Sequence, residues 1–167
     1  MKTVLITGPI GSGKSEVRRY LESQGFPVYD CDSRTKMLYE SVPGLKKEIE
    51  ERLGVPFSQL GIIFSDESRR LALEELVYPL VVKDINEWKK SLPEGTETAY
   101  IESAVAMEKP MFDSLYDEIW LVDAPVEQRM KRNPKAAERD ALQHFDKSRI
   151  ARFLNNDSTI ENLLSQL

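Results

Sequence analysis

The sequence has almost none of the residues that build disulfide frameworks or clustered metal centres. It contains one cysteine, Cys31, and one histidine, His144, among 167 residues. A single cysteine cannot form an internal disulfide, and a lone histidine with no cysteine near it offers no zinc-type ligand set. We therefore expect no internal disulfide, and we expect His144 to lie at the surface.

Long apolar runs and an excess of positive charge are also missing. No segment approaches the roughly 20 apolar residues that span a bilayer, and the first apolar run is too short for a signal-peptide core. The formal net charge is −5, with 41% hydrophobic and 31% charged residues, which gives no basis for general affinity toward nucleic acid or acidic membranes. We expect one globular domain over residues 1–167, cytoplasmic, and a monomer or weak homo-oligomer.

A glycine-rich segment carries the clearest pattern that is present. Residues Gly8-Pro9-Ile10-Gly11-Ser12-Gly13-Lys14-Ser15 fit the phosphate-binding pattern G-x-x-x-x-G-K-[ST] at every fixed position. The apolar run 3–7 predicts a strand before it, and the spacing of apolar residues in 16–22 predicts a helix after it. Backbone N–H groups can then converge on phosphate oxygens at a helix start, with Lys14 reaching the outer phosphates and Ser15 holding Mg²⁺. The segment therefore predicts a nucleotide site.

Carboxylates follow two further predicted strands. The apolar run 26–29 predicts a strand ending at Asp30 and Asp32, and 98–102 predicts one ending on Glu102. Ligands collect outside the carboxyl ends of strands in open α/β sheets, and residues two apart on an extended chain point to the same side. Either aspartate could therefore act as a base, and Glu102 could lie near Mg²⁺ or an acceptor hydroxyl. Alternatively, Asp30 only caps the next helix and Glu102 is a surface acid.

The remaining pattern predicts an α/β fold with a mainly parallel sheet. Further strands are expected at 117–124 and 153–154. Residues from about 33 to 91 are helical in pattern, with a break at 43–44. Pro79 is expected to end one helix, and another helix is expected to begin after it. This helical insertion could form one side of a binding site for an acceptor substrate, or it could only cover the sheet. A capping box over 158–161 predicts a last helix.

Arginines make the C-terminal third locally basic in an otherwise acidic chain. Arginines near a phosphate loop often clamp a transferring phosphoryl group, although scattered arginines are more often solvated helix surface. The members of this group are Arg129, Arg132, Arg139, Arg149 and Arg152.

With these pieces in order, the chain resembles the dephospho-CoA kinase family over nearly its whole length. The glycine-rich loop alone is shared by many nucleotide-binding families, so the second-strand Asp-x-Asp and the segment running to Glu108 narrow the match. The segments that carry the resemblance are Ile6 to Ser15, Pro27-Val28-Tyr29-Asp30-Cys31-Asp32, Tyr78-Pro79-Leu80-Val81, Ile101-Glu102-Ser103-Ala104 with Glu108, Leu121-Val122-Asp123-Ala124-Pro125 and Asn156-Asp157.

The resemblance implies an activity and a set of roles. That family transfers the γ-phosphoryl group of ATP to the ribose 3′-hydroxyl of dephospho-CoA. It implies that Asp32 is the catalytic base, that Lys14 and Ser15 contact phosphate and Mg²⁺, and that Arg132 or Arg139 is the lid arginine. Asn156 would lie near the adenine-binding loop. The resemblance also assigns the acceptor side to Asp30, Tyr78, Glu102 and Glu108.

Three departures from the family pattern bear on the acceptor and on closure. Tyr78 stands where the family usually has histidine, and Glu102 stands where many members have aspartate. The lid segment, at about residues 126–150, is shorter than the family's lid, and 139–143 matches either its end or its beginning. Lid closure excludes water and completes the phosphate clamp, so a short lid could slow turnover or favour another acceptor.

Two other functions compete with this expectation. One is a phosphate-loop kinase that uses another hydroxyl or a nucleoside monophosphate as acceptor. The other is a nucleotide-binding regulator or partner that has lost efficient transfer. The presence of Lys14, Ser15 and Asp32 argues against the regulator, and the short lid segment argues for it.

Overall fold

The computed structural model describes residues 1–140 and 142–167, apart from the side chain of Phe64. The chain forms two compact units. The first contains Met1–Asp30 and Ser91–Leu167, and the second contains Cys31–Lys90. The second unit covers nearly all of the predicted helical insertion, while the single domain expected over 1–167 stays a prediction.

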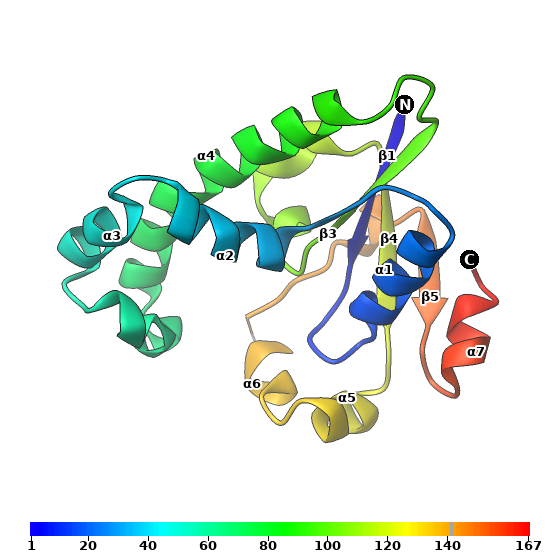
Figure 1. Cartoon of the computed structure of the whole chain (residues 1–167). Coiled ribbons are helices and arrows are strands. Elements are labelled where there is room, and N and C mark those ends of the chain that lie inside the picture. The colour runs from blue at the N-terminus through cyan, green and yellow to red at the C-terminus, as the bar shows by residue number, and fades with distance from the viewer. Residues whose placement is uncertain (141) are drawn as a thin grey trace. The chain divides into compact units, whose positions relative to one another are not determined.

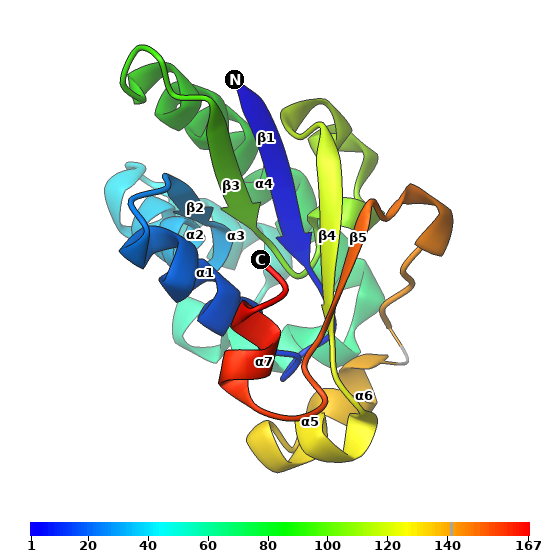
Figure 2. The ribbon, with the colours of Figure 1, turned by 90° about the vertical axis from the view of Figure 1, so that its right-hand side faces the viewer.

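A five-stranded parallel sheet is the frame of the first unit. Its strand order is β2-β3-β1-β4-β5, and the strands are β1 (Lys2–Thr7), β2 (Val28–Asp30), β3 (Thr98–Glu102), β4 (Glu118–Asp123) and β5 (Arg152–Asn155). All five predicted strands are therefore present, and the α/β class is confirmed. In Figure 2 the arrowheads of β1, β3 and β4 point toward the end of the sheet where α5 and α6 lie.

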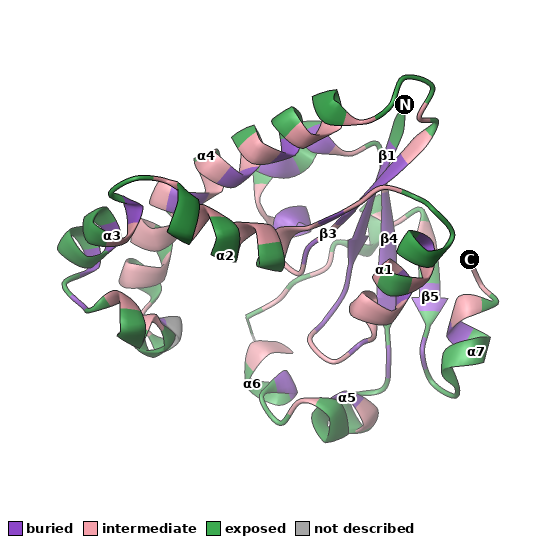
Figure 3. Cartoon of the chain, in the orientation of Figure 1, coloured by how far each residue is buried: buried purple, intermediate pink, exposed green. Residues whose placement is uncertain are grey.

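The central strand β1 shows why this sequence forms such a sheet. Residues 3–7 are all buried, because β3 and β4 pair with β1 on either side and both faces are covered. Figure 3 shows this buried strand in purple, with green on the exposed faces of the helices. Strands buried on both faces read as continuous apolar runs, which is why the run 3–7 was a reliable signal.

Helices α1 (Lys14–Ser23) and α7 (Ile160–Leu164) share one core cluster with the sheet. Helix α1 buries Val17 and Leu21, four residues apart on one face, and α7 buries Leu163. Helix α1 is followed by Gly25, whose φ is 84°. The N–H of Gly25 donates to the carbonyl of Glu22, and the N–H of Phe26 donates to the carbonyl of Leu21, which together close the end of the helix.

Short helical turns complete the first unit. They are η2 (Ala106–Glu108), η3 (Pro110–Leu115), α5 (Val126–Arg132), α6 (Ala136–Asp140) and η4 (Lys147–Arg149). Part of the lid segment, residue 141, falls outside the described residues. Helix α7 begins one residue later than the predicted capping box allows. Its cap is Thr159, whose side chain accepts from the N–H of Asn162, so the expected pairing of Ser158 with Glu161 is wrong.

In its described residues the second unit is built of helices. These are α2 (Cys31–Ser41), α3 (Leu45–Leu53), η1 (Phe57–Ser65) and α4 (Glu67–Ser91), whose last residue belongs to the first unit (Figure 1). The predicted break after 43 is confirmed, with Gly44 in the left-handed region before α3.

The predicted break of α4 at Pro79 is wrong, because one helix of 25 residues runs through it. Val77, Val81 and Ile85 are buried at four-residue spacing on both sides of the proline. A proline inside a helix costs about 3 kcal/mol, and burying this apolar stripe offsets that loss. In the described part of the chain, no helix is both long and apolar enough to cross a membrane.

Candidate active site

The glycine-rich loop joins β1 to α1, as the sequence predicts. Gly8, Gly11 and Gly13 have φ angles of 149°, 77° and 106°. Residues that carry a side chain rarely adopt these backbone angles. A Cβ on Gly8 would lie 2.0 Å from the carbonyl oxygen of Val122, and one on Gly13 would lie 2.4 Å from Nδ2 of Asn156. Both the backbone angles and the lack of space therefore require glycine here.

Lys14 opens α1 and points back onto the loop. Its Nζ donates to the carbonyl oxygens of Gly8 at 2.8 Å and Pro9 at 3.1 Å. Burial lowers the pKa of Lys14 to about 8, an effect that Glu102 opposes and Arg129 reinforces. The ammonium group is thus held among the loop carbonyls, beside the backbone that is expected to receive phosphates.

Asn156 supports the loop from behind. Its side chain is 3% exposed, and Nδ2 donates to the carbonyl oxygen of Ser12 at 2.8 Å. Among the described residues, Oδ1 of Asn156 and Oγ of Ser12 are buried without a hydrogen-bond partner. Asn156 therefore fixes the loop backbone, and its expected place near an adenine ring stays a prediction.

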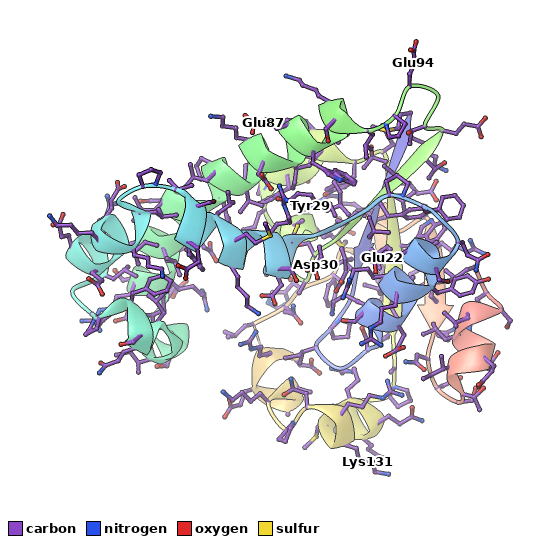
Figure 4. All side chains as sticks on the ribbon, in the orientation of Figure 1. Glu22, Tyr29, Asp30, Glu87, Glu94 and Lys131 are labelled. Atoms are coloured by element: carbon purple, nitrogen blue, oxygen red, sulfur yellow. The ribbon has the colours of Figure 1, made fainter. Side chains whose placement is uncertain are left out.

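Arg132 brings a second positive charge to the loop. It lies at the end of α5, and its guanidinium donates to the carbonyl oxygen of Gly11 at 3.0 Å. Lys131, the neighbouring residue on α5, is exposed and points away from the rest of the unit (Figure 4). The structure therefore places Arg132, one of the two candidate lid arginines, at the glycine-rich loop, and its contact with phosphate stays a prediction.

Arg129 lies one turn before Arg132 and is buried, with 7% of its surface exposed. Its two terminal nitrogens donate to the two carboxylate oxygens of Asp140, each at 2.6 Å, and Nε donates to the carbonyl oxygen of Ala124 at 2.9 Å. Arg129 and Asp140 also line a pocket of about 230 Å³, together with Pro9 and Asp123. The buried Arg129 thus holds the lid segment in place close to the loop.

A charge cluster occupies the carboxyl ends of β2 and β3. Asp30 and Glu102 are register partners in the parallel pair, and Arg18 of α1 lies 3.6 Å from the carboxylate of Asp30 and 3.0 Å from that of Glu102. Burial raises the pKa of Glu102, while Lys14 and Arg18 act against that rise. Figure 4 labels Asp30 at the end of β2. The sequence predicted both acids at this edge, but not the arginine between them.

Two other predicted residues lie in the lid segment and beside it. Glu108 is in η2, and its carboxylate accepts a hydrogen bond from the backbone N–H of His144. His144 is exposed, as expected. Arg139 is half-buried in α6, next to Asp140.

Asp32 and Tyr78 belong to the second unit. Asp32 lies in the first turn of α2, where its exposed carboxylate is 2.7 Å from Nζ of Lys36. The expectation that Asp30 and Asp32 point to the same side of one extended chain is therefore wrong, because helix α2 begins at Cys31, between them. The hydroxyl of Tyr78 donates to Glu74 at 3.3 Å, and burial raises the pKa of Tyr78 well above its usual value.

The donor set at the loop is compatible with Mg²⁺ bound mainly through a nucleotide. Within the described residues, no group of three or more acidic, histidine or cysteine side chains could hold a metal ion by itself. Mg²⁺ commonly keeps several waters and binds through one or two protein oxygens plus substrate phosphates. The half-buried Ser15, in the first turn of α1, supplies a protein oxygen of this kind.

Sequence reasoning gave no role to Arg18 or Asp123, and it named Arg129 only as one of five arginines that could clamp a phosphoryl group or lie on a solvated helix surface. Arg18 follows Lys14 by four residues, and this spacing places both on one face of α1, toward the predicted strand ends. That signal was available. The partner of Arg129 is eleven residues away on a separate short helix, and no periodicity connects the two.

Comparison with known proteins shows what the chain is similar to. The family model described as dephospho-CoA kinase matches residues 2–161. The dephospho-CoA kinase of Porphyromonas gingivalis is 36% identical over 141 residues, which are 79% of this chain and 68% of that protein. The chain thus spans about two-thirds of the length of this relative.

Solved structures give the same picture for the fold. The crystal structure of TT1252 from Thermus thermophilus superposes with a TM-score of 0.80 and 28% identity, covering 97% of this chain and 92% of that one. A dephospho-CoA kinase from Campylobacter jejuni, 18% identical, covers 99% of this chain and 94% of its own with a TM-score of 0.67. At that identity the second likeness supports the fold alone.

Proposed function

Because this chain belongs to the dephospho-CoA kinase family, we propose that the phosphate loop, Arg132 and Asp32 together carry out the family's reaction. Membership supports a phosphotransferase that uses ATP to convert dephospho-CoA into coenzyme A. Our proposal adds the residues that perform each step, the 3′-hydroxyl as the acceptor, and the cytoplasm as the compartment.

The observation that carries the proposal is the convergence of two cations on the glycine loop. Lys14 and Arg132 both donate to loop carbonyls, and the loop glycines keep side chains away from the same backbone. Phosphoryl transfer needs mainly positioning and neutralisation of phosphate charge. The loop N–H groups would hold the inner phosphates of ATP, while Lys14 and Arg132 would meet the outer ones.

The hydroxyl of Ser15 would hold Mg²⁺, with water and phosphate oxygens as the remaining ligands. When bound, Mg²⁺ supplies further neutralisation of charge on the phosphates. Nothing else in the scheme depends on the ion. The protein's own residues position the nucleotide and receive the proton.

We assign the base to Asp32, whose exposed carboxylate lies two residues after the end of β2. The 3′-hydroxyl oxygen forms a bond to the γ-phosphorus, and the bond between that phosphorus and the β,γ-bridging oxygen breaks. ADP leaves, and the hydroxyl proton passes to the carboxylate of Asp32.

Acceptor recognition is assigned to four further residues. Tyr78 and Glu108 would contact dephospho-CoA, and Asp30 and Glu102 would act at the sheet edge with Arg18 between them. Asn156 would keep its place beside the nucleotide by holding the loop backbone.

A panel of acceptors tests the proposal directly. The protein is incubated with ATP, Mg²⁺ and either dephospho-CoA, a nucleoside monophosphate, shikimate or gluconate, and the products are identified by mass. We expect phosphorylation of dephospho-CoA to be fastest. A faster rate with another acceptor would move the protein to that acceptor class, and no transfer to any of them would support a nucleotide-binding regulator.

The base is tested by paired substitutions. Asp32→Asn keeps the size of the side chain but removes its charge, so we expect binding of ATP and dephospho-CoA to persist while most turnover is lost. Asp30→Asn serves as the matched variant and should do less damage. Full activity in Asp32→Asn would remove Asp32 from the mechanism.

A further inference from the structure

The lid segment contacts the phosphate loop directly through α5. Gly11 lies against the backbone of Arg129, since a Cβ on Gly11 would come within 2.8 Å of the Arg129 carbonyl oxygen. One turn further along α5, Arg132 donates to the carbonyl oxygen of that same glycine. The loop and this short helix therefore share a tight junction at a single residue.

A buried clamp holds α5 in that place. Arg129 forms a bidentate pair with Asp140 of α6, and its third donor is used by the carbonyl of Ala124 at the end of β4. A guanidinium fixed at three acceptors has little rotational freedom, and a planar fork matched to a carboxylate is specific in geometry as well as in charge. The pair therefore orients α5 with respect to both α6 and the sheet.

Helix α5 itself offers few other anchors. It has seven residues, and Arg129 is the only one of them that is buried. Seven residues are too few for a stable isolated helix, so tertiary contacts must set its orientation. Among these contacts, the pair of Arg129 with Asp140 is the one made by a buried side chain of α5.

We propose that Arg129 is a positioning residue for phosphoryl transfer, whose pair with Asp140 holds α5 on the phosphate loop so that Arg132 is aimed at the outer phosphates. The inference rests on the proposed function for the identity of the reaction. It gives this short lid segment a preformed phosphate contact, where a longer lid would have to close on the substrate. Arg129 acts through Arg132 and the loop, and is not itself a catalytic residue.

The test uses the full chain with three variants. Arg129→Met removes both charge and hydrogen bonds, Arg129→Lys keeps the charge but loses the fork, and Arg149→Met removes an arginine from the exposed pair with Asp113 as a control. All are assayed at a temperature where circular dichroism shows them folded. If Arg129→Met does not fold, Asp140→Asn breaks the same pair.

Misplacing a catalytic group by about 1 Å can reduce rate by about 10²-fold. We expect Arg129→Met and Arg129→Lys to lower kcat/KM for ATP by about 10- to 100-fold, with Arg149→Met unchanged. Both Arg129 variants should change KM for ATP as well as kcat, whereas a loss of folded protein alone would lower kcat and leave KM unchanged. Wild-type kcat/KM in Arg129→Lys, or an equal loss in Arg149→Met, would overturn the positioning role.

A binding measurement separates this inference from the proposed function. Calorimetric titration with ATP alone should show about tenfold weaker binding in both Arg129 variants than in the wild type. This result does not depend on which acceptor the protein uses. Absence of dephospho-CoA phosphorylation by the wild type would reject the function, whereas unchanged ATP affinity in both variants would reject the clamp.

Discussion

The phosphate loop and the lid segment both lie at the carboxyl ends of the strands, yet the protein builds them in different ways. The loop, residues 8–15, consists of consecutive residues whose conformation is fixed by glycines with positive φ. The lid segment depends on side chains distant in sequence, such as Arg129 with Asp140 and Arg132 with Gly11. The loop is shaped by its backbone, and the lid segment is held in place by charged side chains.

This difference determines how each region should respond to mutation. In the loop, adding a Cβ to one of the glycines should disrupt the structure, but few specific side chains are needed. In the lid segment, replacing a single charged residue should be enough to disrupt the structure. The predictions below test that contrast, beginning with the one side chain on which the loop does depend.

Lys14→Ala should produce the largest effect. The variant loses the point charge aimed at the outer phosphates, so we expect turnover to fall by at least about 10³-fold while circular dichroism shows an intact fold. Lys131→Ala, on the exposed side of α5, is the matched control and should keep wild-type activity. Unchanged ATP binding and turnover in a folded Lys14→Ala protein would contradict the assignment of the loop.

Arg132→Ala and Arg139→Ala should differ. Arg132 reaches the loop carbonyl of Gly11 and should lower kcat by about 10²-fold when truncated, the scale of a lost transition-state donor. Arg139→Ala should lower kcat much less. Steady-state kinetics with saturating dephospho-CoA measures both, and equal, negligible losses would mean that the lid segment is only a surface helix.

Gly13→Ala and Gly25→Ala separate backbone strain from lack of space. Both glycines have positive φ, but a Cβ on Gly13 would meet Asn156 at 2.4 Å while none lies within 4 Å of one on Gly25. The left-handed conformation costs alanine about 1–2 kcal/mol in each. We therefore expect a similar loss of unfolding free energy from strain, with a further loss and roughly tenfold weaker ATP binding in Gly13→Ala alone. Equal behaviour of the two variants in urea unfolding and calorimetry would contradict the close packing of the loop.

Most of the fold could be predicted from the sequence because its signals are local. Parallel strands buried on both faces read as apolar runs, and Gly25 and Gly44 mark a helix end and a helix start through their backbone angles. The error at Pro79 arose because tertiary packing of the stripe around it outweighs local propensity. The cap of α7 lies one residue later than predicted because Thr159 and Ser158 are equally able to cap a helix, so the sequence does not distinguish them.

The candidate site could be predicted only in part. Its loop was found because a fixed spacing of glycines and Lys14 reflects one backbone geometry. The pairs of Arg18 with Glu102 and of Arg129 with Asp140 were not predicted, because the two partners of each pair come from different elements. Whether an arginine is solvated or buried in a pair depends on the tertiary structure, and charge patterning along a chain does not encode it.

The pH dependence of ATP affinity should be a smaller effect, specific to the loop. The pKa of Lys14 is about 8, so its protonated fraction falls by about tenfold between pH 7 and pH 9. We expect ATP affinity to weaken by about the same factor over that range. Calorimetry on Lys14→Met should show weaker binding with no such limb, and a wild-type limb that persists in this variant would assign the titration to another group.

The smallest effect should be on stability, and its sign follows from the same shift. The pKa of Lys14 is lowered from 10.5 to about 8 by burial, so between these pH values the unfolded chain holds a proton that the folded protein has released. The free energy of unfolding contributed by Lys14 therefore rises as pH increases from about 8 to 10.5. At pH 7 the buried ammonium destabilises the folded protein, so Lys14→Met should unfold at a higher urea concentration than the wild type. The gap between the two urea midpoints should narrow toward pH 10, and a gap that widens would show that the ammonium stabilises the empty loop.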